Sequence, residues 1–330
     1  MITVLATGIA GCGKPRYLRE FEKFCFENGK NCKVVSIGDL MFQAAEEIGI
    51  KVKEEKILNL PRTTLRTLIS LAFERCLIEY SQRKSNYDLM IISTHASYWW
   101  KNGPEHAFDI SFLNKIKIDI YVTFINDIVR IRDKIYSDPK WGREIIKVSE
   151  IITWQELEIY TTEIMAMLQN KSFYVFHVDY PLQTFYDMIF SNKPKIYTSF
   201  PMTFFKSTYK VRKFINFLQK YAVVFSPSLE EDKGKFEEKI PINQLRNWIV
   251  RKDYKLIDQS DILVAYFPEI IHSPGVEKEI SYAHTSNKEV WLIFPQKKLS
   301  PFTPYYSDKI FNSFNQFKKF FLKFIKQSKR

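Results

Sequence analysis

A glycine-rich segment near the N-terminus has the composition and spacing of a phosphate-binding loop. Gly8, Gly11, Gly13 and Lys14 lie in the stretch GIAGCGK, which follows an apolar run and matches the first seven positions of GxxxxGK[ST]. Glycines let backbone N–H groups turn toward a phosphate chain, the lysine adds charge, and the start of a following helix adds its dipole. The segment therefore predicts binding of ATP or a related nucleotide.

The metal-binding part of this pattern is incomplete. Pro15 occupies the eighth position, where Ser or Thr would hold magnesium. Proline is tolerated in the first turn of a helix, so the fold should survive. Ser93 ends a predicted strand where a metal-orienting aspartate is expected. The sequence therefore predicts nucleotide binding with a weakened Mg²⁺ site and slow phosphoryl transfer.

The first part of the chain, about residues 1–190, resembles the archaeal-type adenylate kinases, which are small P-loop nucleoside monophosphate kinases. The resemblance rests on TGIAGCGK at 7–14, IGDLM at 37–41 and ISTHA at 92–96, in the family's order. It implies that the loop glycines and Lys14 hold ATP phosphates and that Asp39, with Arg62 or Arg66, lies on the monophosphate side. The cations that it assigns to the lid or the transition state are Arg130, Arg132 and Arg143.

Several of these residues have a structural alternative. Arg130 and Arg132 could form a solvated helix face, and His95 at a strand end is more often a structural histidine than a catalyst. The aromatic run at 98–100 could stack a base or could pack as a surface cluster. The sequence alone leaves these alternatives open.

A second resemblance covers about residues 195–305. The segments DYKLIDQSDILVA at 253–265 and SPGVEKEISYA at 273–283 resemble the nucleoside 2-deoxyribosyltransferase superfamily, and within it the 2′-deoxynucleoside 5′-monophosphate N-glycosidases. The resemblance implies that Glu279 is a nucleophile and that Asp253 orients it and shares protons with the leaving base. Glu279 is placed in the first turn of a helix, whose dipole is expected to favour the ionised carboxylate.

The same resemblance assigns the substrate contacts. Ser273 stands where transferases of free nucleosides carry a carboxylate, so it favours a 5′-phosphate. Ser300 matches a serine that is donated to the neighbouring subunit's phosphate site, which implies a homodimer through the C-terminal domain. The remaining residues of this site are Tyr197, Ser199 and Gly275. The relatives' glycine-rich, arginine-bearing first loop is FPMT here at 200–203, so Lys206 or Arg212 would have to supply its charge.

These residues must be positioned by two α/β domains. Apolar, β-rich runs alternate with helical patterns along the chain, which is typical of parallel sheets. A polar break at 191–195 divides a P-loop, kinase-like domain at 1–192 from a doubly wound, Rossmann-like domain at 195–330. The predicted strands of the first domain are 2–7, 33–37, 88–94, 118–124 and 172–178, and those of the second are 195–199, 222–225, 261–266 and 290–294.

Composition limits the classes of function. The 330 residues are 45% hydrophobic and 26% charged, as in ordinary globular proteins, and the absence of a long apolar run or signal sequence indicates a cytosolic protein without membrane contact. The net charge of +12 is concentrated in residues 308–330, which carry seven basic residues and one aspartate. A helix that covers the second sheet is favoured there over contact with membrane or RNA. Four cysteines without a CxxC pair predict free thiols.

The sequence therefore predicts a nucleotide-metabolism enzyme that couples a nucleotide-binding P-loop domain to an N-glycosidase or deoxyribosyltransferase domain. A nucleotide sensor without phosphoryl transfer is the main rival, and Pro15 is its support. An active nucleoside monophosphate kinase and an RNA-associated ATPase are further alternatives.

Overall fold

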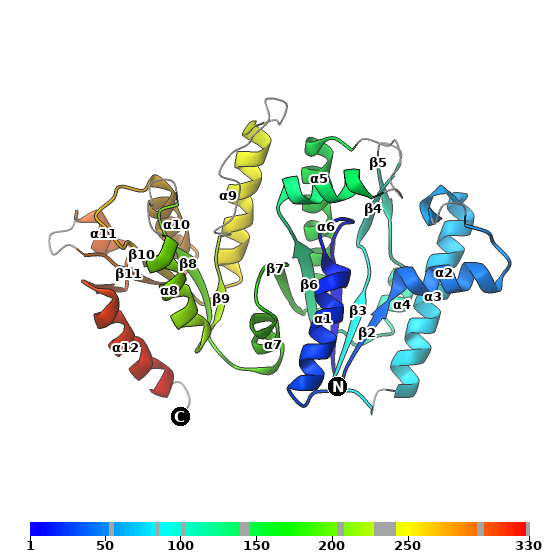
Figure 1. The fold of residues 1–330 in the computed structure, drawn as a ribbon, viewed down its shortest axis with the longest axis horizontal. Helices are drawn as coiled ribbons and strands as arrows, with labels where there is room; N and C mark the ends of the chain where they lie inside the picture. The colour runs from blue at the N-terminus through cyan, green and yellow to red at the C-terminus, as the bar shows by residue number, and fades with distance from the viewer. Residues whose placement is uncertain are drawn as a thin grey trace. The chain divides into compact units, whose positions relative to one another are not determined.

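The computed structural model describes residues 1–52, 56–83, 86–100, 103–138, 146–202, 208–227, 242–295 and 300–327. Arg143, Lys206 and the charged segment at 230–239 lie outside these ranges. The chain forms two compact units, mainly residues 1–182 and mainly residues 183–330. Figure 1 shows their strands in separate five-stranded sheets. The domain ends at 192 and 195 stay a prediction.

The sheet of the first unit is entirely parallel and has the order β2-β3-β1-β6-β7. Its strands are β1 (Ile2–Thr7), β2 (Cys32–Ser36), β3 (Leu89–Ser93), β6 (Ile120–Ile125) and β7 (Ser172–His177). Every residue of β3 is buried, as expected for a parallel strand covered on both faces. The five predicted strands are confirmed, with ends shifted by two residues at most.

Helices connect these strands, and the last of them leads into the second unit. They are α1 (Lys14–Glu27), α2 (Ile37–Glu47), a 3₁₀ turn (Ile57–Asn59), α3 (Arg62–Arg83), α4 (Ile110–Leu113), α5 (Ile128–Ser137), α6 (Val148–Leu168) and α7 (Leu182–Phe190). In α6 the buried face includes Ile151, Trp154, Glu158 and Thr162, which follow the three- and four-residue spacing of one helical face. This face places polar side chains in the core of the unit.

An antiparallel ribbon follows β3, and the sequence analysis did not predict it. It consists of β4 (Ser97–Trp100) and β5 (Gly103–His106). The strands are short and belong to neither parallel sheet. They therefore lie outside the alternation of strands and helices from which the other strands were predicted. Its importance is that β4 carries aromatic residues directly after the end of β3.

The sheet of the second unit is also parallel and has the order β12-β11-β10-β8-β9. Its strands are β8 (Lys195–Ser199), β9 (Val223–Phe225), β10 (Ile262–Tyr266), β11 (Glu289–Ile293) and β12 (Lys309–Phe311). The four predicted strands are confirmed, and the short edge strand β12 was not predicted. The chain runs from β8 to one side and then to β10 on the other side. In such doubly wound sheets, ligands bind at the carboxyl ends of the strands at this reversal.

The helices of the second unit are α8 (Thr208–Gln219), α9 (Ile242–Asp258), α10 (Pro274–Thr285), α11 (Phe302–Tyr305) and α12 (Phe314–Gln327). The predicted terminal helix is confirmed as α12, which buries Phe317, Phe321 and Ile325 in the core beside Trp291. Its lysines at 319, 323 and 326 are exposed. The basic tail is therefore an amphipathic helix packed on the sheet.

Two further expectations concern membranes and thiols. Over the described parts of the chain, no helix has both the length and the apolar character to cross a bilayer. Cys12, Cys25, Cys32 and Cys76 are all buried and free, as predicted.

Candidate functional site

The glycine-rich loop connects β1 to α1, and the space around it explains two of its glycines. A Cβ atom on Gly8 would lie 2.7 Å from the backbone oxygen of Phe124 on β6, and one on Gly11 would lie 3.1 Å from that of Ile131 on α5. Gly11 has a φ of +80° and Gly13, the N-cap of α1, a φ of +95°, which glycine adopts without strain. The loop therefore wraps the N-terminus of α1, as phosphate binding requires.

Lys14 is buried beneath this loop. Its Nζ donates to the backbone oxygen of Ala6, at 3.2 Å, and to that of Thr94, so it connects the ends of β1 and β3. Burial lowers the pKa of Lys14 to about 8, while the nearby Cys12 and Glu158 oppose this shift. The lysine is thus held by backbone carbonyls at the base of the phosphate cradle.

The residues around the loop fit a phosphate chain better than they fit a metal ion. Pro15 has neither the hydroxyl that would ligate Mg²⁺ nor a backbone N–H for phosphate. Ser93, at the end of β3, is buried. Among the described residues, no group of three His, Cys, Asp or Glu side chains is arranged to hold a metal. ATP phosphates can therefore lie over Gly8 to Lys14, while this loop supplies no side-chain ligand for magnesium.

Glu158 is a central residue of this region that the sequence analysis missed. Its Oε1 accepts from the backbone N–H of Gly8 at 2.9 Å and of Ala96 at 2.8 Å. Its Oε2 accepts from the backbone N–H of Ser97 at 2.8 Å and from the Ser97 hydroxyl at 2.9 Å. Burial raises the pKa of Glu158, and these donors together with Lys14 oppose the rise. The carboxylate therefore ties the first loop glycine to the turn between β3 and β4.

A sequence signal for Glu158 did exist. It lies on the apolar stripe of α6, four residues after Trp154 and four before Thr162, and it is fully buried. A carboxylate on such a stripe needs several donors to offset its desolvation. The sequence could not identify those donors, because they lie in the loop after β1 and at the turn into β4, far from Glu158 in the chain.

The residues assigned to the monophosphate side do not form one cluster. Asp39 lies exposed in the first turn of α2, where its N–H donates to Ser36. Arg62, at the start of α3, pairs with Glu105 on β5, and not with Asp39. Arg66 is exposed on α3. The role of Asp39 and Arg62 in substrate binding stays a prediction.

The proposed lid cations that the structure describes are both on α5. Arg130 pairs with Asp179 at 2.6 Å, and Arg132 pairs with its neighbour Asp133 at 2.8 Å. Both acidic partners are substantially exposed. This arrangement is compatible with the solvated helix face that the sequence left open, and a catalytic role stays a prediction.

In the second unit, Glu279 on α10 is held by two side chains of β8. Its Oε1 accepts from the Tyr197 hydroxyl at 3.0 Å, and its Oε2 accepts from the Ser199 hydroxyl. Tyr197 and Ser199 are two residues apart on the strand and therefore face the same side of the sheet. Since β8 pairs with β10, Glu279 lies at the carboxyl end of β8, where the strand order reverses. This is the expected position of a ligand site in this fold.

Asp253 and Lys252, adjacent on α9, belong to the same site. Both are buried, and the Lys252 Nζ lies 3.7 Å from the Asp253 Oδ1. Burial raises the pKa of Asp253, and Lys252 opposes the rise. Burial and then the charge of Asp253 raise the pKa of Glu279 to about 8, against the hydrogen bonds from Ser199 and Tyr197 and the charge of Lys252. The two carboxyl groups are thus coupled and favour retention of a proton.

This result corrects the expected ionisation of Glu279. The helix α10 begins at Pro274 and has Glu277 in its first turn, so Glu279 lies in the second turn, where the dipole effect is weak. Desolvation and Asp253 dominate instead. Lys252 was also missed, because its only sequence signal was its place beside Asp253. Its burial could be recognised only from the packed structure.

The residues assigned to the phosphate lie around the ends of the second unit's helices. Ser273 is the buried N-cap of α10, and Gly275 is exposed in the first turn with open space around it. Ser300 is exposed before α11, and its backbone oxygen accepts from Thr303. Arg212 is exposed on α8. Ser273 can face an anion, because unpaired N–H groups gather at a helix N-terminus.

The raised pKa of Glu279 leads to a prediction about stability. The pKa is 4.5 for an ordinary glutamate and about 8 here, so the folded state retains a proton that the unfolded state releases between these values. The stabilisation that accompanies this proton is complete below pH 4.5 and is lost as the pH rises toward 8. Glu279→Gln keeps the shape and is neutral at every pH. We expect its melting temperature to exceed that of the parent at about pH 9 and to equal it near pH 5.

Thermal unfolding followed by circular dichroism across this pH range measures the difference. Glu277→Gln is the control, because Glu277 lies on the same helix with an exposed side chain. An equal effect of the two substitutions, or a Glu279→Gln difference that does not grow with pH, would contradict the coupling.

Comparisons with known proteins give one family model and several solved structures to which this chain is similar. A family model described as the AAA domain matches residues 7–152. A CMP N-glycosidase from Clostridium botulinum has 18% identity and a TM-score of 0.26, with 37% of this chain and 94% of that chain covered. A shikimate kinase from Bacteroides thetaiotaomicron has 14% identity and a TM-score of 0.32, with 54% and 87% covered. A gluconokinase from Sinorhizobium meliloti 1021 has 12% identity and a TM-score of 0.29, with 55% and 85% covered.

The family match agrees with the structure of the first unit. It begins at Thr7, the last residue of β1, and ends at Ile152 within α6, so it includes the glycine-rich loop, β3 and β6. The loop lies between a parallel strand and a helix, which is the structural context that the motif requires. The first unit of this chain therefore contains an AAA-like P-loop domain over residues 7–152.

Proposed function

We propose that the second unit cleaves the N-glycosidic bond of a nucleoside 5′-monophosphate and that the first unit binds ATP or a related nucleotide with little phosphoryl transfer. The observation that carries the proposal is the Glu279 carboxylate, oriented by Tyr197 and Ser199 and coupled to the buried Asp253. An oriented carboxylate beside a second carboxyl group is the equipment for breaking a bond at an anomeric carbon.

The proposed reaction uses the two carboxyl groups in different roles. In the reactive state the proton of the pair has passed from Glu279 to Asp253, so Glu279 is ionised. One of its oxygens then forms a bond to C1′ while the bond from C1′ to the base breaks. The electron pair of that bond goes to the base nitrogen, and Asp253 supplies the proton. Water then attacks C1′, gives a proton to the Asp253 carboxylate and releases Glu279 as a carboxylate. A second nucleobase in place of water would give deoxyribosyl transfer.

Lys252 and the β8 hydroxyls support this division of roles. Tyr197 and Ser199 each hold a different Glu279 oxygen, so the carboxylate does not rotate away from C1′. The charge of Lys252 opposes the rise in the pKa of both Glu279 and Asp253, so it offsets part of the desolvation cost of an ionised carboxylate. The site can therefore hold one proton and one negative charge at neutral pH.

The preference for a monophosphate depends on Ser273 at the N-terminus of α10. We expect Ser273→Asp to raise the KM of nucleoside monophosphates by on the order of tenfold or more, with nucleosides little affected, because a second negative charge repels the phosphate. Ser273→Asn is the matched control, since Asn has the same size as Asp and both are good N-caps. Steady-state kinetics on paired nucleoside and monophosphate substrates measure the effect. Equal KM changes for the Ser273→Asp and Ser273→Asn proteins would show that the substrate phosphate is not bound beside Ser273.

Ser300 extends this proposal to a dimer. If a second copy of the chain completes the phosphate site, as the family resemblance implies, Ser300 of one subunit contacts the phosphate held by the other. The exposure of Ser300 ahead of α11 is compatible with such a contact.

A nucleotide sensor is the second candidate function. Pro15 favours it, because the loop retains its phosphate cradle and has lost the hydroxyl that would hold magnesium for transfer. In this reading, the first unit binds a nucleotide and controls the second unit or a partner.

One experiment separates these functions. The full chain is incubated with a panel of nucleoside and deoxynucleoside monophosphates, with and without ATP and Mg²⁺, and chromatography resolves free base, diphosphate and triphosphate. Free base supports the glycosidase, and its dependence on ATP adds regulation by the first unit. Diphosphate without free base would identify a kinase. If a nucleotide binds but neither free base nor diphosphate forms, the nucleotide sensor would be the supported function.

A further inference from the structure

Two helices of the second unit, α8 and α12 (Figure 1), carry basic side chains and no acidic one. The segment TYKVRKFINFLQ of α8 has three cations and the segment FNQFKKFFLKFIKQ of α12 has four, so together they supply +7 of the net charge of +12. Helix surfaces that only face water usually mix both signs, because like charges one turn apart repel each other. A surface of one sign therefore indicates an anionic partner.

The two helices lie side by side on the sheet. Phe214 of α8 and Phe317 of α12 are fully buried, and their ring centroids are 6.2 Å apart. The rings of Phe217 and Phe321 are 5.9 Å apart. The charges of the two helices therefore belong to one continuous surface.

The proposed glycosidase site does not use these charges. Both helices contribute to the core cluster that includes Ile196 of β8, whereas the next residue on that strand, Tyr197, donates to Glu279. Successive side chains of a strand point to opposite faces of the sheet. The helix pair therefore covers the face opposite to the one that holds Glu279.

The cations lie on the outer side of the helix pair. Lys319, Lys323 and Lys326 are exposed, and their spacing places them in one stripe opposite the buried face of α12. Lys213 of α8 and Lys220 directly after it are exposed as well. None of these five lysines forms an ion pair with another described residue. We call these five residues the basic face.

The apolar side chains of α12 argue against a lipid surface as the partner. Phe317, Phe321 and Ile325 are at most 7% exposed and fill the core, and Leu322 is the one apolar residue of this helix that is exposed. An interfacial helix needs a free apolar face to insert between lipids. The helix α12 uses its apolar face for the fold and presents charge outward.

An exposed aromatic ring lies beside the basic face. Tyr209 of α8 is 69% exposed, and the Lys213 Nζ lies 6.0 Å from the centroid of its ring. Proteins that bind single-stranded nucleic acid combine cations, which hold the phosphates, with aromatic rings, on which unpaired bases stack. The bases of a duplex are already stacked on one another, so a duplex cannot use such a ring. The ring therefore favours a single strand.

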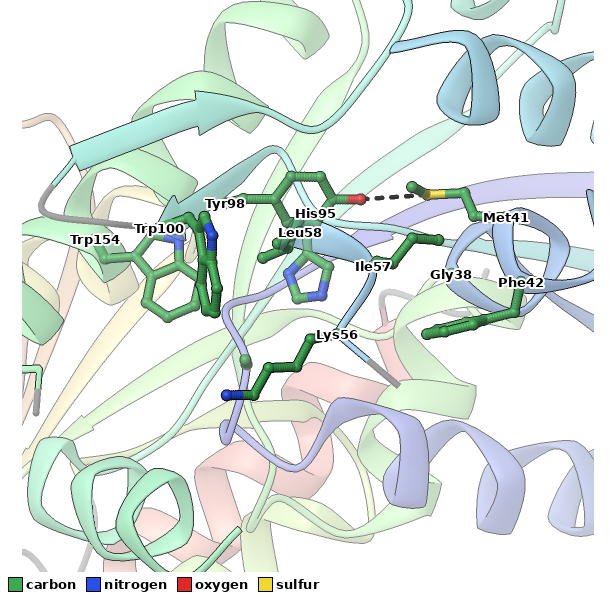
Figure 2. Close-up of a pocket in the computed structure, with 11 residues that line it drawn as sticks. Gly38, Met41, Phe42, Lys56, Ile57, Leu58, His95, Tyr98, Trp100 and Trp154 are labelled. Atoms are coloured by element: carbon green, nitrogen blue, oxygen red, sulfur yellow. Dashed lines mark hydrogen bonds between the residues drawn. The ribbon is translucent and has the colours of Figure 1, made fainter. Parts of the chain in front are cut away.

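The cavity of the first unit offers no comparable surface for a polyanion. Its volume is about 230 Å³, which is below the roughly 300–1,000 Å³ of ordinary small-ligand pockets. Figure 2 shows aromatic residues such as Trp100 and Trp154 around it, and Lys56 is the single charged residue among the described residues that line it. A chain of phosphates would find little charge there.

We propose that the basic face binds the phosphate backbone of single-stranded nucleic acid and that Tyr209 stacks on one of its bases. Such binding is independent of base sequence and weakens with salt, because each phosphate contact releases condensed counterions. The proposal does not rest on the glycosidase function, since the two sites lie on opposite faces of the sheet.

Fluorescence anisotropy of the full chain tests this binding. The probe is a single-stranded RNA of about 20 nucleotides and mixed sequence, which exceeds the usual site of one binding domain. Its 5′ end carries the label and its 3′ end a hydroxyl, so no terminal monophosphate is present, and excess ATP occupies the glycine-rich loop. With about four phosphate contacts, we expect affinity to fall about fiftyfold between about 50 and 200 mM KCl.

Replacing Lys319, Lys323 and Lys326 together with glutamine removes three charges and keeps good helix-forming residues. The slope of log affinity against log salt should become shallower by about 2, because each contact to a single strand contributes about 0.7. At about 50 mM KCl the affinity should fall at least about tenfold. The matched control replaces three exposed lysines of the first unit with glutamine and should bind as the parent does; these are Lys23, Lys115 and Lys117. Melting temperatures check the fold of both proteins.

Tyr209→Ala separates a single strand from a duplex. It should weaken RNA binding about tenfold, as the loss of one stacked base does, and should leave the binding of duplex DNA of equal length unchanged. Sedimentation with phosphatidylserine vesicles tests a lipid surface directly.

Four results would overturn the proposal: no binding of the RNA, equal losses in the α12 triple variant and its control, equal effects of Tyr209→Ala on RNA and duplex, or binding to vesicles without binding to RNA. Base release by the parent protein is measured separately, so failure of either proposal leaves the other intact.

Discussion

Replacing Glu279 with alanine is expected to lower the rate of base release from nucleoside monophosphates by at least about a thousandfold. The substitution removes the atom that would form the bond to C1′ and the charge that stabilises the cationic sugar, and no other described side chain can take its place between Tyr197 and Ser199. Glu279→Gln should lose activity equally, because an amide keeps the hydrogen-bonded shape but is a poor nucleophile. Chromatographic measurement of free base over time gives the rate.

The control is Glu277→Ala, two residues earlier on α10 with an exposed side chain that pairs with His272. It should retain the parent rate. Trapping of a glycosyl ester on Glu279, detected by mass spectrometry of the intact protein, would support covalent catalysis directly. A Glu279→Ala protein that releases base as fast as the parent would exclude the proposed nucleophile, and the sensor would then become the favoured function.

The second large effect concerns the phosphate loop. We expect Lys14→Ala to weaken the binding of ATP by at least about a hundredfold, because the backbone amides alone must then balance several phosphate charges. Lys23→Ala, an exposed substitution on the same helix, should bind ATP as the parent does. Calorimetric titration with ATP measures both. Melting temperatures are needed as well, because Lys14 also donates to Ala6 and Thr94 in the core.

The parent protein should transfer phosphate slowly, well below the range of about 1 to 100 per second that is typical of kinases. The reason is that Pro15 cannot hold magnesium. Pro15→Ser restores the hydroxyl and should raise any phosphoryl transfer. Turnover in the normal range by the parent protein would show that magnesium is held without this side chain and would favour the kinase alternative.

Much of the fold could be predicted because its signals are local. The glycine-rich loop was identified from seven residues, and the strands β1 and β8 have the predicted bounds. Buried parallel strands are recognisable as apolar runs with helical segments between them. The β4–β5 ribbon and β12 were missed, because elements of three or four residues that include polar side chains carry too little signal. The equally short β9 was predicted because its residues VVF are an apolar run.

The site chemistry depended on tertiary structure. The sequence indicated Glu279 and Asp253 by resemblance, but it placed Glu279 in a helical first turn and expected an ionised group. Packing brings α9 beside α10 and places the buried Asp253 and Lys252 near the partly buried Glu279, so desolvation and like charge determine the pKa. Likewise Glu158, and the donors that it needs at Gly8, Ala96 and Ser97, are far apart in the chain. A sequence motif specifies which groups are present, whereas burial and neighbouring charge, which determine protonation, exist only once distant segments have packed.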